Sequence, residues 1–233
     1  MSEENLKSIF AGVRRAMPVV LGYIPIGFAY GVLAGKSGLS FFNALLMSII
    51  VFAGSAQFIA VGLIASGAGA ASIIATTFIV NLRHMLMAAS LAPCLSKWKK
   101  SMQALFAYEL TDETFALHSS AASSLNEKKT EAIVLNVTCQ LSWILGTVLG
   151  LVAAGIMGDI KPFGLDFALA AMFIGLLVGQ CLDYPRIFAA VLAGVIATIM
   201  YMAGFQQSCV IVSSIIAASV GLGVEQWVKQ KSA

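Results

Sequence analysis

The chain has 233 residues, of which 59% are hydrophobic and only 11% are charged, and its mean hydropathy is +0.91. An ordinary soluble domain carries about 25% charged residues, so this composition excludes one and indicates an integral membrane protein. The formal net charge of +3 comes from Lys and Arg at the ends of apolar segments, where they anchor helices beside anionic lipid, and it does not indicate nucleic-acid binding.

Apolar segments of helical length dominate the chain. Because the hydrocarbon core of a bilayer takes roughly 20 apolar residues of helix, they predict an all-α integral membrane protein. We expect a polytopic helical bundle of about seven or eight transmembrane segments, with broken or re-entrant helices, as a single transmembrane domain over residues 1–233. The sequence shows neither a cleavable leader pattern nor paired cysteine spacing, so we expect no signal peptide, disulfide, metal or cofactor.

The first apolar segment runs from about Met17 to Ala34. Pro25 removes one backbone hydrogen bond and the nearby glycines let another backbone approach, so a kinked or interrupted helix is predicted. Basic residues precede this segment, and others lie near the end of the chain. By the positive-inside tendency, both termini are expected in the cytoplasm.

The next stretch, residues 41–91, is almost continuously apolar and leaves two dissections open. In the first, helices cover residues 41–65 and 70–92. In the second, a re-entrant piece near residues 41–57 precedes a crossing that stops at Asn81.

Residues 102–122 are moderately apolar but carry several ionisable groups. If they cross the bilayer, the chain has about eight helices, and the basic loop at residues 96–100 falls outside, against the positive-inside tendency. If they do not, about six spanning helices with re-entrant pieces place every basic cluster inside, and protein must shelter the non-helical backbone. We interpret the sequence in favour of the first arrangement, with broken elements. Four further crossings are predicted at about residues 132–157, 167–182, 187–205 and 209–224.

Between Lys36 and Lys97 the only charged residue is Arg83, in the tetrad Asn81-Leu82-Arg83-His84. A charge in hydrocarbon costs about 2.5 to 3.5 kcal/mol on insertion scales, and it is seldom retained without a partner or ligand. A guanidinium offers a carboxylate a bidentate pair. We therefore predict that Arg83, Asn81 and His84 bind an anionic group. The alternative is an arginine that snorkels to the interface beside a histidine that caps a helix end.

Glu109, Asp112 and Glu113 have i, i+3, i+4 spacing, so on one helix they would share a face. Carboxyls this close raise one another's pKa. One of them could then couple transport to protons or hold an ammonium group, or the three could form the solvated face of a surface helix. Ser55 and Gln57 are further candidates for binding a polar ligand, although small residues around them also fit a helix-packing notch.

Four sequence blocks carry a resemblance to a known family. They are Pro25-Ile26-Gly27-Phe28-Ala29-Tyr30-Gly31, Phe52-Ala53-Gly54-Ser55-Ala56-Gln57-Phe58, Asn81-Leu82-Arg83-His84 and Thr111-Asp112-Glu113-Thr114-Phe115-Ala116. In these blocks the chain resembles the AzlC family, the large subunit of bacterial branched-chain amino acid exporters. The resemblance implies efflux of leucine, isoleucine, valine or analogues across the inner membrane, driven by protons, with a small AzlD-type membrane subunit as partner.

The resulting hypothesis is a transporter and not an enzyme. Arg83 with Asn81 would bind the substrate carboxylate, and one of the three acids would take the ammonium group or the proton. A transporter or channel for another small organic solute is the first alternative. A small membrane enzyme that uses a histidine as acid or base is the second, but the sequence has no GxxxxGKS, HExxH or GxSxG motif to support it.

Overall fold

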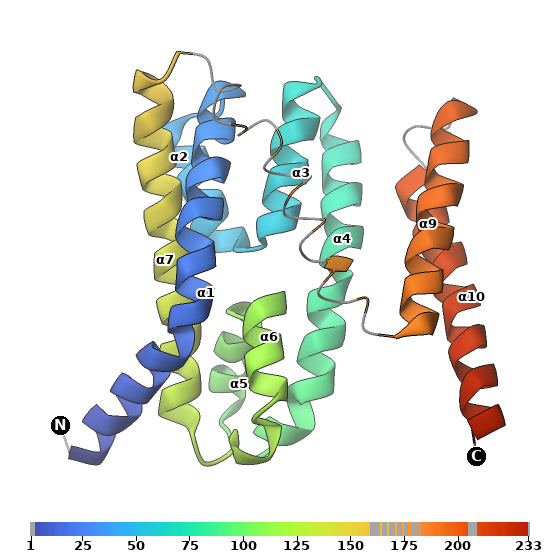
Figure 1. Ribbon diagram of the computed structural model, residues 1–233. Helices are drawn as coiled ribbons and strands as arrows, with labels where there is room; N and C mark the ends of the chain where they lie inside the picture. Colours follow the sequence, from blue (N-terminus) through green and yellow to red (C-terminus); the bar gives the residue numbers. More distant parts are fainter. Residues whose placement is uncertain are drawn as a thin grey trace. The chain divides into compact units, whose positions relative to one another are not determined.

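The computed structural model describes residues 3–158, 183–204 and 209–232, together with seven isolated positions: Gly164, Phe167, Ala171, Ile174, Leu177, Val178 and Cys181. The chain forms two compact units, residues 1–169 and 170–233. Every regular element in the described residues is helical (Figure 1). Most of the crossing predicted near residues 167–182 lies outside the described residues.

The predicted all-α membrane protein is confirmed. Four described helices are long and apolar enough to cross a bilayer, by length and composition: Glu3–Lys36, Ala70–Leu95, Lys129–Ile156 and Tyr184–Met202. The last of these, α9, pairs with α10 (Cys209–Ser232) to form the second unit, and the two helices agree with the last two crossings that we predicted.

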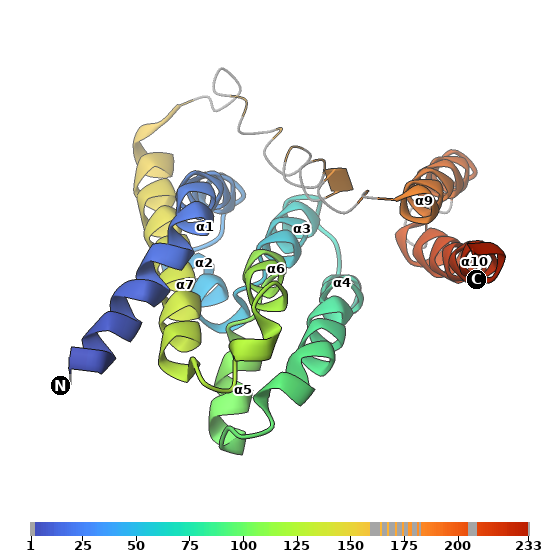
Figure 2. The same ribbon diagram turned by 60° about the horizontal axis from the view of Figure 1, so that its bottom comes forward.

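Three long helices frame the first unit: α1 (Glu3–Lys36), α4 (Ala70–Leu91) and α7 (Lys129–Ile156). Helix α1 is continuous through Pro18 and Pro25, so the interruption that we considered near Pro25 is absent. The helix bends only in its N-terminal part (Figure 1). Helices α1 and α7 pack side by side, and α4 lies across the shorter helices from them (Figure 2).

Glycines bring α1 and α7 into backbone contact. Gly27 and Gly31 of α1 face Gly146 and Gly150 of α7, so each helix contributes a Gly-x-x-x-Gly pair. A Cβ atom added at Gly27 would lie 2.8 Å from the Trp143 carbonyl oxygen, and the other three positions are tighter still. Small residues at such spacing let helices associate in a membrane without a hydrophobic driving force.

A helical hairpin descends from the end of the unit where α1 finishes (Figure 1). Helix α2 (Phe41–Leu46) continues as a π-helical turn, η1 (Met47–Val51), and the chain reverses at Phe52, which has a left-handed φ of 41°. Helix α3 (Gly54–Ala65) then returns to the same end. Because each arm has about half the length of a crossing, residues 41–65 form a re-entrant hairpin.

A second hairpin enters from the opposite end (Figure 1). Helix α5 (Lys100–Tyr108) rises to its C-cap at Glu109, and α6 (Asp112–Ser119) runs back. Residues 102–122 therefore do not form one spanning helix, and the arrangement that we favoured is wrong at this point. The re-entrant alternative describes it better.

The two dissections of residues 41–91 were each half right. The first places the ends of the segments correctly but treats residues 41–65 as one helix. The second dissection correctly contains a re-entrant piece, but it predicts that the following crossing stops at Asn81, whereas α4 continues to Leu91.

The order of elements repeats with inverted direction. A long helix, α1, is followed by the hairpin α2–α3, and then α4 runs the other way and is followed by the hairpin α5–α6 (Figures 1 and 2). Inverted repeats of this kind are common in secondary transporters, where ligand sites lie at the interface between the repeats. The tips of the two hairpins meet at that interface.

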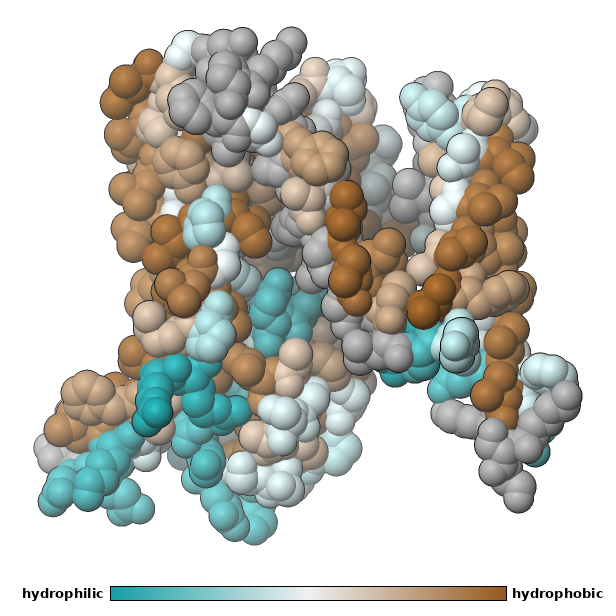
Figure 3. Space-filling view, viewed as in Figure 1, coloured by the Kyte–Doolittle hydropathy of each residue, from teal (hydrophilic) through white to brown (hydrophobic). Residues whose placement is uncertain are grey.

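Hydrophilic residues gather at one end of the first unit (Figure 3), where α1, α5 and α7 begin, and many of them are basic. The basic residues are Lys7, Arg14, Arg15, Lys97, Lys99, Lys100, Lys128 and Lys129. Among residues 3–158, Lys36 is the one basic residue at the opposite end of the unit.

This geometry makes a topological prediction. Single cysteines at Lys99 and Glu127, in a cysteine-free background, should react with an impermeant thiol reagent from the same face of the membrane. A control cysteine at Ser37, at the other end of α1, should react from the opposite face. Labelling of positions 99 and 127 from opposite faces would contradict the second hairpin.

Candidate functional site

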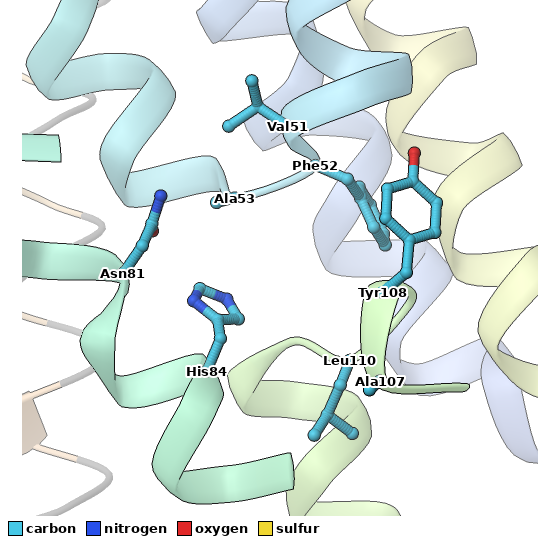
Figure 4. A pocket seen from close by; sticks show the side chains of 8 residues that line it. All are labelled: Val51, Phe52, Ala53, Asn81, His84, Ala107, Tyr108 and Leu110. Atoms are coloured by element: carbon cyan, nitrogen blue, oxygen red, sulfur yellow. The ribbon is translucent and has the colours of Figure 1, made fainter. Parts of the chain in front are cut away.

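A cavity of about 180 Å³ lies between the two hairpin tips and the middle of α4 (Figure 4). Its lining residues are Val51, Phe52, Ala53, Asn81, His84, Ala107, Tyr108 and Leu110. Drug-sized ligands occupy pockets of about 300 to 1,000 Å³, so this cavity suits a small metabolite. Asn81 and His84 point into it from α4, as Figure 4 shows, and both were predicted as site residues from the sequence.

Arg83 links the two hairpins. Its Nη1 lies 2.8 Å from Asp112 Oδ2 at the start of α6, and its Nη2 donates to Ser55 Oγ at the start of α3. The structure thus brings together three residues that the sequence predicted separately. The buried Nε of the guanidinium has no hydrogen-bond partner, and neither has the buried acceptor Oδ1 of Asn81.

The beginnings of α3 and α6 both lie at this ion pair. The N-terminus of a helix carries partial positive charge and stabilises anions. Thr111 caps α6 through a reciprocal capping box with Thr114, whereas Ala53 gives α3 no side-chain cap. The site is therefore rich in fixed positive potential, which suits the carboxylates in the first turn of α6 and also an incoming carboxylate.

Tyr23 holds the N-terminus of α6 against α1. Its hydroxyl oxygen lies 2.6 Å from Glu113 Oε2 and 2.6 Å from Thr111 Oγ1, so its single hydrogen is available to the carboxylate. Tyr23 was not among the site residues predicted from the sequence. The available signal was a polar group inside the apolar segment, two residues before Pro25.

Glu109 is separated from the other two acids, so the predicted single carboxyl face is wrong. Glu109 is the C-cap of α5, whereas Asp112 and Glu113 begin α6, and Leu110 and Thr111 between them are not helical. The side chain of Glu109 is only 3% exposed, and its Oε2 has no hydrogen-bond partner. Glu109 lies outside the four long helices, and burial alone raises its pKa to about 7.

Gln57 is buried away from the cavity lining. Its Nε2 donates to Ser48 Oγ at 3.0 Å, and Ser48 in turn lies 2.9 Å from Thr147 Oγ1 on α7. This chain of polar groups fastens the first hairpin to α7. A role for Gln57 in substrate binding stays a prediction.

Tyr108 connects the two hairpin tips directly and was also missed. Its hydroxyl donates to the carbonyl oxygen of Ile49 in the π-helical turn, and Gln140 Nε2 donates to the same oxygen at 3.1 Å. A π-helical turn frees such a carbonyl from its usual partner, and these turns recur at functional sites.

His118, the second histidine, lies in the buried part of α6. Its Nε2 is 2.7 Å from Asn136 Oδ1 on α7, and burial lowers its pKa. Near the basic end, Arg15 of α1 pairs with Glu131 of α7 at 2.7 Å and donates to the Leu117 carbonyl of α6 at 3.0 Å. These contacts tie α6 to both long helices.

Comparison with known proteins agrees with the motifs. The family described as "AzlC protein" matches residues 18–157, a range that contains both hairpins and every residue of the candidate site. Inner membrane protein YgaZ of Escherichia coli (strain K12) is 30% identical over 195 residues, which cover 79% of this chain and 80% of the relative. An uncharacterized membrane protein of Archaeoglobus fulgidus is 31% identical, with 82% and 84% covered.

A third relative carries a functional name. The branched-chain amino acid transport protein AzlC of Bacillus subtilis (strain 168) is 28% identical, over 78% of this chain and 73% of the relative. No solved structure matches the chain significantly. Because the family match spans more than half of the sequence and includes the site, this chain belongs to the AzlC family, a family of membrane transport proteins.

Proposed function

We propose that the protein is a secondary transporter that exports branched-chain amino acids across the bacterial inner membrane. Family membership and the name of the Bacillus subtilis relative support this substrate. The observation that carries the proposal is the ion pair between Arg83 and Asp112, which lies where the two hairpin tips meet.

An amino acid carries both a carboxylate and an ammonium group, so it can bind Arg83 with the first and Asp112 with the second. Its carboxylate would replace Asp112 and Ser55 on the guanidinium, using the free Nε–H for a bidentate pair. Its ammonium group would bind the released Asp112 carboxylate and the unpartnered Asn81 Oδ1. One ion pair is then replaced by two, so neither Arg83 nor Asp112 is left without a partner of opposite charge.

The cavity supplies the environment for a branched side chain. Most of its lining is apolar, with Val51, Phe52 and Leu110 at the two tips. A hydrophobic pocket distinguishes side chains that differ by one methylene by only about 1 to 3 kcal/mol. We therefore expect leucine, isoleucine and valine all to be substrates.

We further propose an orientation in the membrane, a coupled ion and a partner subunit. The basic end of the first unit would face the cytoplasm, in keeping with the positive-inside tendency, and export would be coupled to proton entry through one of the predicted carboxyls. A small AzlD-type membrane subunit would be the partner. The apolar outer face of α4, with Ile74, Phe78 and Leu86 exposed, would face lipid or that subunit.

Efflux of labelled leucine from preloaded cells tests the function. Cells that express this chain with an AzlD-type subunit should release leucine faster than cells that express the small subunit alone. Excess isoleucine or valine should compete. Isocaproate, which lacks the ammonium group, and isoamylamine, which lacks the carboxylate, should not. Efficient competition by isocaproate would instead indicate an organic-anion transporter, and unchanged leucine release would refute export.

A further inference from the structure

We propose that Glu109 is the residue that carries the coupled proton. This inference rests on the proposed function and narrows it, because the spacing of Glu109, Asp112 and Glu113 left all three as candidates. The structure separates them by their helix ends, their partners and their burial.

Asp112 and Glu113 each have a close charged or hydrogen-bonding partner. Both lie in the first turn of α6, where the helix dipole favours negative charge. Asp112 pairs with Arg83 at 2.8 Å, and Glu113 accepts a 2.6 Å hydrogen bond from the Tyr23 hydroxyl. Protonation of either group would give up these interactions.

Glu109 has the opposite surroundings. It is the C-cap of α5, and the C-terminal end of a helix disfavours negative charge. It is almost fully buried, its Oε2 accepts no hydrogen bond, and it makes no ion pair within the part of the chain that the structure describes. A carboxyl in this position favours its protonated form more than an exposed carboxyl does, and water or a cation that reached it would favour the anion.

The titratable groups packed near Glu109 do not offset the effect of burial on its pKa. The titratable side chain that interacts with it from α7 is the thiol of Cys139, which brings no positive charge. From α4, Arg83 is engaged by Asp112, and from α1 Tyr23 is engaged by Glu113. Burial alone therefore raises the pKa of Glu109 to about 7, so its carboxyl can change protonation state near neutral pH.

The position of Glu109 also couples its proton to the substrate. It follows Tyr108 and precedes Leu110, both of which line the cavity. A movement of this hairpin tip that opens the cavity to one side of the membrane would hydrate Glu109 from the same side. The carboxylate would take a proton from the outer solution and release it to the cytoplasm in the opposite conformation, with no other bond made or broken.

The test compares two modes of leucine movement in proteoliposomes that contain the chain and its small subunit. Glu109→Gln should retain exchange of labelled for unlabelled leucine but lose leucine movement driven by an imposed pH gradient, and the pH dependence of exchange should disappear. Glu109→Asp should restore gradient-driven transport. Asp112→Asn should lose both modes, because it removes a partner of the ion pair.

The outcomes separate this inference from the proposed function. Wild-type proteoliposomes without leucine exchange or pH-driven transport would refute the function itself. Wild-type transport together with pH-driven transport by Glu109→Gln would overturn the assignment of Glu109 alone. Loss of exchange as well as driven transport in a Glu109→Gln protein that elutes and melts like the wild type would also overturn it, because a group that only carries the proton is not needed for exchange.

Discussion

Arg83→Lys should lower leucine efflux by about 10- to 100-fold while the protein remains folded. Lysine keeps the positive charge, and so it can still offset Asp112, but it is a point donor and cannot form a bidentate pair with a carboxylate. Hydrogen bonds to charged groups contribute about 1.5 to 3 kcal/mol each, which corresponds to that range of rates. Initial rates of labelled leucine efflux, normalised to the amount of protein in the membrane, measure the effect.

Arg83→Ala tests whether loss of transport is loss of binding or loss of folding. The alanine variant leaves Asp112 without its partner; removal of one member of a fully buried pair costs about 3 to 5 kcal/mol, and we expect a smaller loss of stability here because the two side chains are 29% and 20% exposed. The double variant Arg83→Ala with Asp112→Asn removes both charges, so it should regain stability but not efflux. Arg186→Lys is the control that matches Arg83→Lys. Arg186 pairs with Asp183 at 3.2 Å, and because both side chains are exposed, this position should tolerate lysine. Wild-type efflux from Arg83→Ala would remove Arg83 from the mechanism.

Gly150→Val should prevent stable assembly of the first unit. An added Cβ at Gly150 would overlap the carbonyl oxygen of Phe28 on α1, which is backbone and cannot rotate away. Overpacking of a core costs about 1 to 3 kcal/mol when side chains can adjust, and here two helices must separate, so we expect a larger loss. Thermal unfolding in detergent, followed by size-exclusion chromatography, measures it.

Gly155 provides the control for this change. It lies on the same helix, and an added Cβ there would have no neighbour within 4 Å. Gly155→Ala should keep or slightly raise the melting temperature, because alanine is favoured over glycine in helices by about 1 kcal/mol. Equal tolerance of Gly150→Val and Gly155→Ala would show that α1 and α7 do not pack as described.

The long helices were predictable because their local pattern and their tertiary role agree. Helix α7 begins at Lys129, within three residues of the predicted start, and ends one residue from the predicted end. The first hairpin was harder to predict, because its arms are as apolar as a crossing and no charge marks its reversal. The first tip turns at Phe52, which has a left-handed conformation although it is not glycine, so the usual turn signal is missing.

Part of the site could be found from chemistry alone. Arg83 could be predicted because it is the one charged residue in a long apolar stretch, and its neighbours Asn81 and His84 line the cavity. The sequence could not show that Asp112 is the partner of Arg83, because that pairing depends on the second hairpin folding back. It also could not show Tyr23, whose partners are 88 and 90 residues away in the chain.

The inverted pair of hairpins has a thermodynamic consequence. If one tip withdraws to admit solvent from one side, the opposite tip has an equivalent movement available toward the other side, with similar strain and similar loss of packing. Two conformations that are related by the pseudo-two-fold axis of the repeats and have comparable free energy favour neither direction by themselves. Transport is then reversible, and the concentrations of substrate and of protons on the two sides of the membrane determine which way the net flow runs.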